Sequence, residues 1–109
     1  MKPVDWLGDS LARLREFPRH AMREAGHQLE LVQDGREPKN WKPISAIAAG
    51  VNELRIRAGG AFRVIYVAKF AEAVYVLHAF EKKSRRTAPL DIELARSRFR
   101  NLIRTRRSQ

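Results

Sequence analysis

The chain has 109 residues, of which 44% are hydrophobic and none is cysteine, and 22 basic against 12 acidic side chains give a formal net charge of +10. This length and composition indicate one globular domain, residues 1–109, and exclude two domains or a largely disordered chain. Without cysteine, a disulfide scaffold, a thiolate metal site and a cysteine nucleophile are excluded.

The first third of the chain predicts two amphipathic helices. Asp9 is placed to cap a helix over Ser10–Phe17. Pro18 suits the first turn of a second helix that runs to about Val32, and Gly35 ends it. Their apolar faces are expected to contain Leu7, Leu11 and Leu14 in the first case, and Ala21, Ala25, Leu29 and Val32 in the second. Together they predict an N-terminal helical hairpin.

After Lys39 the pattern changes from helix to strand. The segment Trp41–Ile44 is irregular or a short edge strand, because Pro43 has no N–H to donate to a sheet. Three strands are then expected, over Glu53–Ala58, Phe62–Lys69 and Ala73–Phe80, with turns at Gly59-Gly60 and Phe70–Glu72. These strands predict an antiparallel meander.

A last helix is expected near the C-terminus. Thr87 is placed to cap it, Pro89 lies in its first turn, and Asp91 and Glu93 lie near its positive end. Its core stripe is Ile92, Ala95, Phe99 and Leu102 or Ile103, and a basic stripe beside it holds Arg96, Arg100, Arg104 and Arg107. The end past Arg104 is expected to fray. Two helices, a small antiparallel sheet and a final helix make an α+β fold.

The register of the first hairpin decides which face the arginines take. A two-residue loop at Gly59-Gly60 pairs Ile56 with Arg63 and mixes charged and apolar groups on both faces. A three-residue loop, Gly59–Ala61, pairs Arg57 with Arg63 and puts Arg55 on the same face. Because burying an unpaired arginine costs several kcal/mol, the second register is predicted. Its apolar face then holds Leu54, Ile56, Val64 and Tyr66.

The third strand extends the arginine face. An even-length turn after Lys69 pairs Val67 with Val76, Ile65 with His78 and Arg63 with Phe80. His78 then lies on the same face as the arginines. Lys82, four residues later, is expected on that face too. The predicted cluster of Arg55, Arg63, His78 and Lys82 favours phosphate binding and includes one group that titrates near neutrality. The alternatives are a solvated strand face and a hydrogen-bonded histidine within the sheet.

The positive charge is concentrated at one end. Residues 81–109 carry 10 basic and 3 acidic side chains, a net of +7, whereas residues 1–80 have a net of +3. A charge so placed attracts polyanions, of which nucleic acid is the commonest in a cell.

Other site classes find little support. No apolar run approaches the roughly 18 residues of a membrane span, and Met1–Asp9 has no apolar segment typical of a signal peptide, so a cytoplasmic protein without a membrane partner is expected. His20 and His27 are too far apart to share a metal ion, and no glycine-rich phosphate loop is present. Neither a metal nor a cofactor is therefore expected.

Three strings carry a resemblance to a known family: ELRIR at 53–57, FRVIY at 62–66 and LHAFEKK at 77–83, supported by WKP at 41–43 and by DIELA at 91–95 followed by Arg98. From about Val4 to Ile103 the chain resembles the RelE/ParE toxin superfamily, in particular its phage-derived, HigB-like branch. The resemblance implies the RelE fold and a type II toxin that cleaves mRNA on the ribosome. It also implies a cognate antitoxin, often one with a helix-turn-helix.

The resemblance also implies roles for individual residues. Arg55 and Arg63 would stabilise the scissile phosphate, Lys82 would add charge, and His78 and Tyr66 are candidates for proton transfer. The candidates for contact with RNA or the ribosome are Arg57, Lys83, Arg85, Arg86, Arg96 and Arg100. Two other functions remain open. One is a ParE-like toxin that binds DNA gyrase without cleaving RNA, and the other is a non-catalytic nucleic-acid-binding module that uses the basic last helix.

Overall fold

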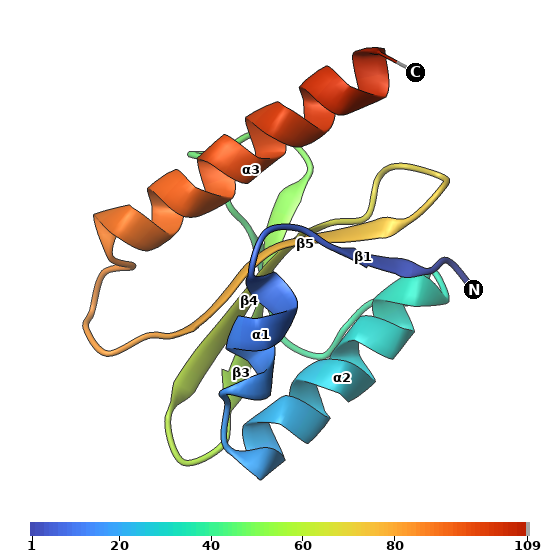
Figure 1. Cartoon of the computed structure of the whole chain (residues 1–109). Helices are drawn as coiled ribbons and strands as arrows, with labels where there is room; N and C mark the ends of the chain where they lie inside the picture. The colour runs from blue at the N-terminus through green and yellow to red at the C-terminus, as the bar shows by residue number, and fades with distance from the viewer. Residues whose placement is uncertain (109) are drawn as a thin grey trace.

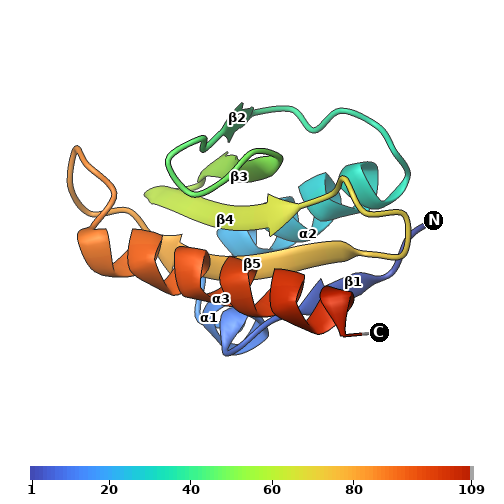
Figure 2. The same cartoon turned by 90° about the horizontal axis from the view of Figure 1, so that it is seen from above.

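The computed structural model describes residues 1–108 as a sheet between two helical layers. In chain order the elements are β1 (Val4–Trp6), α1 (Ser10–Arg15), α2 (Arg19–Gln33), β2 (Trp41–Pro43), β3 (Val51–Arg57), β4 (Ala61–Val67), β5 (Val74–Glu81) and α3 (Pro89–Arg107). Helices α1 and α2 cover one face of the sheet, and α3 crosses the other (Figures 1 and 2). The predicted α+β class is confirmed.

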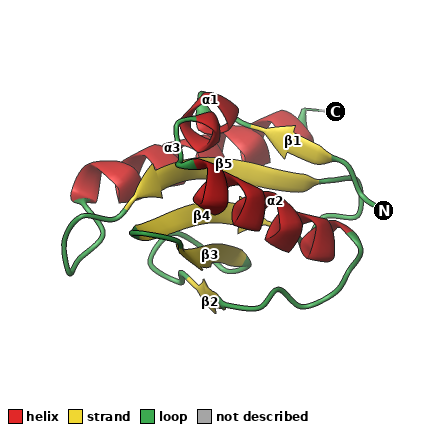
Figure 3. Ribbon diagram, turned by 90° about the horizontal axis from the view of Figure 1, so that it is seen from below, coloured by secondary structure: helices red, strands yellow, loops and turns green. Residues whose placement is uncertain are grey.

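The sheet has five strands in the order β1-β5-β4-β3-β2 (Figure 3). The predicted meander forms its centre, and β2 is the short edge strand expected at Trp41. At the other edge β1 pairs with β5 in parallel, so the sheet is mixed and larger than the expected antiparallel one. The sequence does not predict β1, because three residues are too short for an alternation pattern to be recognised.

Each face of the sheet has its own apolar core. On one face, the predicted stripe of α2, from Ala21 to Val32, packs with Leu14 and Phe17 against the central strands. On the other face, α3 contributes Ala95 and Leu102 as its buried residues. The remaining residues of its predicted stripe, Ile92, Phe99 and Ile103, are partly exposed. The strands are therefore covered on both sides, and α3 is the less deeply packed layer.

The side chains of the first hairpin are distributed between the two faces of the sheet as predicted. Leu54 and Ile56 point to the α1/α2 core, whereas Arg55 lies directly opposite Arg63 on the α3 face. The predicted pairing of Arg57 with Arg63 is wrong by two residues, since Arg57 pairs with Ala61. The three-residue loop is Ala58–Gly60, whose central Gly59 has a φ of +73°. Glycine takes that left-handed conformation without the strain that a Cβ would cause.

The second hairpin contains a β-bulge. Ile65 pairs with His78 and Arg63 with Phe80, as predicted, but Val67 pairs with Tyr75 and not with Val76. The extra residue on β5 is Leu77, because Tyr66 already pairs with Val76. As a result Val76 points to the α1/α2 core, while Leu77 points to the α3 core.

Of the two predicted helix caps, Asp9 occupies the N-cap position of α1 as predicted, whereas Thr87 does not cap α3. Asp9 precedes α1, which ends at Arg15 and not Phe17, but its side chain makes no capping hydrogen bond. Its carboxylate instead accepts from Arg13 Nε at 3.1 Å and from Arg98 Nη2 at 2.6 Å. These bonds lower the pKa of Asp9. Before α3, Ala88 occupies the cap position and not Thr87.

Helix α3 continues to Arg107, past Arg104 where the sequence predicts fraying. Arg106 donates from Nε and Nη2 to the two carboxylate oxygens of Glu72, at 2.7 and 3.2 Å. Its guanidinium carbon also lies 3.6 Å from the centre of the Phe70 ring. Gln109 lies outside the described residues. None of the helices found within residues 1–108 is long and apolar enough to cross a membrane.

Candidate functional site

Four basic side chains gather at the hairpin end of the α3 face. Arg55 and Arg63 pair across β3 and β4, and Arg57 pairs with Ala61 one step closer to the turn. The backbone N–H of Lys82 donates to the carbonyl of Ala61 at 2.7 Å, which places Lys82 in the same row. Because alternate residues share a face, these four residues project to one side. We call Arg55, Arg57, Arg63 and Lys82 the cationic face.

Members of the cationic face differ in exposure. Arg57 is exposed and Arg55 and Lys82 are half-buried, whereas only 8% of the Arg63 side chain is accessible. Nη1 of Arg63 donates to the carbonyl of Phe62 at 3.1 Å, which anchors the group within the sheet. Burial lowers the pKa of Arg63, and the neighbouring positive charges of Arg55 and Arg57 act in the same direction. Arginine remains protonated despite such a shift, so the cationic face has one buried positive charge at Arg63 and three more exposed ones.

Glu53 is the counter-charge of this face, and the sequence interpretation does not identify it. Its Oε1 accepts from Arg55 Nε at 3.2 Å and lies 3.9 Å from Arg63 Nε. Only 6% of the residue is exposed. The alternation of ELRIR places Glu53 on the arginine side, and that parity was the available signal. One carboxylate thus lets two like charges lie side by side.

Both arginines point the Nε side of the guanidinium at Glu53. Among the contacts made by the described residues, the two terminal nitrogens of Arg55 and Nη2 of Arg63 have no hydrogen-bond acceptor. An arginine held in this way presents its remaining N–H groups as a planar fork, which suits two oxygens of a phosphate.

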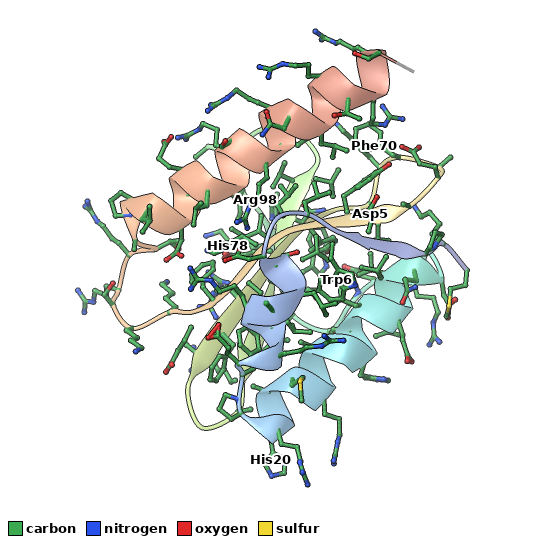
Figure 4. The ribbon with its side chains drawn as sticks, in the orientation of Figure 1. Asp5, Trp6, His20, Phe70, His78 and Arg98 are labelled. Carbon is green, nitrogen blue, oxygen red and sulfur yellow. The ribbon has the colours of Figure 1, made fainter. Side chains whose placement is uncertain are left out.

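His78 lies on the same face but is not part of an open cluster, contrary to the prediction. It has no accessible surface, and its Nε2 lies 2.6 Å from Oδ1 of Asp91 on α3. Its ring stacks on Phe80 with 5.2 Å between centroids. Figure 4 shows His78 close to Arg98, between the sheet and α3. The side chain therefore connects β5 to the start of α3.

The protonation of His78 follows from these contacts. Burial lowers its pKa, and the hydrogen bond with Asp91 offsets this in part. A carboxylate only accepts, so Nε2 carries the proton of the neutral ring. Nδ1 is then the unprotonated nitrogen, and it is buried without a hydrogen-bond partner.

Tyr66 lies on the opposite face from the arginines. It packs in the α1/α2 core with 2% of its surface exposed, and it pairs with Asn52 across β3. Burial raises the pKa of its phenol to about 12. The sheet thus separates Tyr66 from the cationic face.

The other predicted RNA contacts are distributed along the C-terminal part of the chain. Lys83, Arg85 and Arg86 are exposed between β5 and α3, and Arg100 is exposed on α3. Arg96 differs, because it forms an ion pair with Glu93 and donates from Nη2 to the carbonyl of Ala46 at 2.9 Å. That contact holds the segment before β3 against α3.

In residues 1–108 no three histidine or acidic side chains are grouped closely enough to hold a metal ion. The chemistry that the arrangement offers is electrostatic. Fixed guanidinium groups on a rigid sheet can bind an anion and stabilise negative charge that develops on it.

The family model described as phage-derived protein Gp49-like (DUF891) matches residues 12–100. This range includes the cationic face, Glu53 and the His78–Asp91 pair. No curated protein matches the chain.

Proposed function

Because the chain belongs to the Gp49-like family of phage-derived proteins, a RelE/ParE-like toxin family, we propose that it is the toxin of a type II toxin–antitoxin system. We propose further that it acts as HigB-like members do, as an endoribonuclease that cleaves mRNA on the ribosome. The assignment as a toxin is supported by the family match, and the proposed endoribonuclease activity is supported by the cationic face.

The observation that carries the proposal is the direct pairing of Arg55 with Arg63 beside one buried carboxylate. Two like charges on adjacent strands cost stability, and the single negative charge of Glu53 leaves the pair with a net positive charge that a bound anion can neutralise. The exposed Arg57 and the half-buried Lys82 extend the same surface. A scissile phosphate placed there contacts Arg55 from the exposed side and Arg63 from the sheet.

The reaction that suits these residues uses the 2′-hydroxyl group of the RNA as the nucleophile. The 2′-oxygen forms a bond to the adjacent phosphorus, and the bond from phosphorus to the 5′-oxygen breaks. The 2′-hydroxyl loses its proton, and the 5′-oxygen gains one. The phosphorane between these states carries more charge on its equatorial oxygens than the ground state does. Guanidinium groups fixed in position therefore stabilise it selectively.

The positions of His78 and Tyr66 favour electrostatic catalysis over proton transfer by these side chains. His78 is fully buried and bonded to Asp91, and Tyr66 is on the far side of the sheet. Alignment of the 2′-oxygen, the phosphorus and the leaving oxygen then provides the second part of the rate enhancement. We propose that a ribosome, which holds the codon in place, supplies that alignment, so that the reaction depends on the ribosome and takes place in the cytoplasm.

The test is mRNA cleavage by the purified protein on ribosomes that carry a defined codon in the A site. We expect 5′-hydroxyl and 2′,3′-cyclic phosphate ends, and loss of cleavage when ribosomes are omitted. Intact mRNA together with inhibited DNA supercoiling by gyrase would instead support the ParE-like alternative. Co-purification with the product of a neighbouring helix-turn-helix gene would identify the expected antitoxin.

A further inference from the structure

A groove of about 780 Å³ lies between α2 and the uncovered end of β3. The edge strand β2 pairs with β3 only from Asn52 to Leu54. Figure 3 shows β2 as a short strand at the edge of the sheet beside β3. Toward the β3–β4 turn, the Arg55 N–H also donates to the Asn40 carbonyl at 2.9 Å. Beyond that point α2 forms the facing wall, with His20 in its first turn (Figure 4).

The charged residues that line this groove are mostly cationic. Lys39, Arg55 and Arg57 line it, and Glu24 is the acidic residue among its lining side chains. The Glu24 carboxylate already accepts from Gln28 Nε2 at 2.8 Å. Neither Lys39 nor Arg57 forms an ion pair within the described part of the chain. The groove therefore has uncompensated positive charge.

Buried contacts hold the groove open. Gln28 is 3% exposed, and its Oε1 accepts from the backbone N–H of Lys39 at 2.6 Å. Pro38 beside it is also buried. The segment that brings Lys39 and Asn40 to the groove is thus anchored on α2, so the site is preorganised and binding does not have to order it.

Either an acidic peptide or an RNA strand could enter such a groove, and the geometry favours RNA. A peptide that extends the sheet needs a free edge of at least about three residues. Arg55 already donates to Asn40, and alternate residues face the same way, so the unpaired backbone groups on that side are those of Arg57 and the carbonyl of Arg55, fewer than such a peptide needs. Arg55 also belongs to both the lining of the groove and the cationic face. A strand held there is continuous with the phosphate at Arg63.

We propose, on the basis of the ribonuclease function above, that the α2–β3 groove binds the single-stranded RNA that flanks the scissile phosphate. We call its lining residues His20, Lys39 and Asn40 the flanking site, with Arg55 as the link to the cationic face. Lys39 and Arg57 neutralise backbone phosphates, and His20 and Asn40 lie where bases pass. Positive grooves that follow the backbone are the usual means of binding single strands.

The experiment compares Lys39→Glu with Lys42→Glu. Both residues are exposed, both changes alter the net charge equally, and Lys42 on β2 does not line the groove. The probe is a 2′-O-methyl oligoribonucleotide, which binds but cannot be cleaved. We expect Lys39→Glu to weaken its binding on the order of tenfold and to reduce the salt slope by about 0.7 for each phosphate that Lys39 neutralises in the wild type. Lys42→Glu should change the affinity less than about twofold.

In the cleavage reaction, Lys39→Glu should raise KM while leaving kcat unchanged, because the group contacts RNA equally in ground and transition states. Equal effects of the two variants, or an unchanged RNA affinity in both, would overturn the flanking site even if the wild-type protein cleaves mRNA. An unchanged RNA affinity together with weakened capture of an acidic peptide would assign the groove to a protein partner. If the wild type binds the probe but never cleaves mRNA, the ribonuclease function fails, while the difference between the variants still decides the groove. Circular dichroism checks that both variants fold.

Discussion

Arg55 and Arg63 are direct partners across β3 and β4, and both direct Nε toward the carboxylate of Glu53. Glu53 therefore holds the Nε side of the pair, and among the contacts of the described residues both terminal nitrogens of Arg55 and Nη2 of Arg63 remain without an acceptor. A site built in this way is rigid before an anion arrives. Such preorganisation makes a cation effective in stabilising a transition state, since little rearrangement accompanies the reaction.

Replacing Arg63 should remove the more constrained of the two cations. We expect Arg63→Ala to lower mRNA cleavage on programmed ribosomes by about a hundredfold or more. Arg63→Lys should recover only part of the rate, because an ammonium group cannot reproduce the planar fork. The control is Arg23→Ala, an exposed arginine on α2, which should cleave normally. A folded Arg55→Ala/Arg63→Ala double variant with the wild-type rate would remove both residues from the mechanism.

Removing the charge of Glu53 should separate stability from phosphate affinity. Glu53→Gln keeps an oxygen for Arg55 Nε but leaves two arginines without a counter-charge. We expect the free energy of unfolding in urea to fall by about 2 kcal/mol, since the ion pair is buried. Affinity for a non-cleavable RNA should stay the same or rise, because the site becomes more positive.

Glu81→Gln is the matched control for that experiment, because Glu81 is exposed on β5 and the change in net charge is the same. It should leave the unfolding free energy within about 0.5 kcal/mol of the wild type. Equal destabilisation by the two variants would show that the cationic face does not depend on Glu53.

Stability should decrease as the pH falls through the range in which histidine titrates. Burial holds the pKa of His78 below its ordinary value of 6.5, so the unfolded chain binds a proton more readily than the folded one. The stabilising contribution of neutral His78 is then complete above about pH 7 and declines as the pH drops below 6.5. Thermal unfolding between pH 8 and pH 5.5 measures this decline.

His78→Gln should flatten the pH dependence, whereas the exposed His27→Gln should retain it. A His78→Gln profile that falls as steeply as the wild-type profile would assign the acid sensitivity to other groups.

The last turn of α3 should depend on Arg106. Its bonds with Glu72 and its position over Phe70 bind the helix end to the β4–β5 turn. We expect Arg106→Ala to speed amide hydrogen exchange over residues 103–107 and to leave exchange in the sheet unchanged. Arg104→Ala, which removes an exposed charge from the same helix, should have no such effect. Comparable exchange in the two variants would mean that the helix end is stable without the contact. The pKa of Glu72 is lowered to about 2, chiefly by Arg106, so the contact should persist at pH 4.

Several features of the protein could be predicted from the sequence because they depend on neighbouring residues. Strand alternation separates Leu54 and Ile56 from Arg55 and Arg57, and the cost of burying arginine decides which set faces the core. The same local logic predicts the buried stripe of α2 and its end at Gly35, which has a φ of +74°. Most of the cationic face could therefore be predicted from the sequence. The same alternation places Glu53 on the arginine side, so its position could have been predicted as well.

Only the tertiary structure decided how those elements are joined. The bulge at Leu77 is invisible in a strand that is buried on both faces, since no alternation marks the shift. The pairing of β1 with β5, the His78–Asp91 bond and the Arg106–Glu72 contact each join residues far apart in the chain. Such contacts form because packing the helices against the sheet brings their side chains within reach. The sequence suggests His78 as a solvent-accessible catalytic group. In the folded protein it is buried and its bond to Asp91 connects β5 to α3.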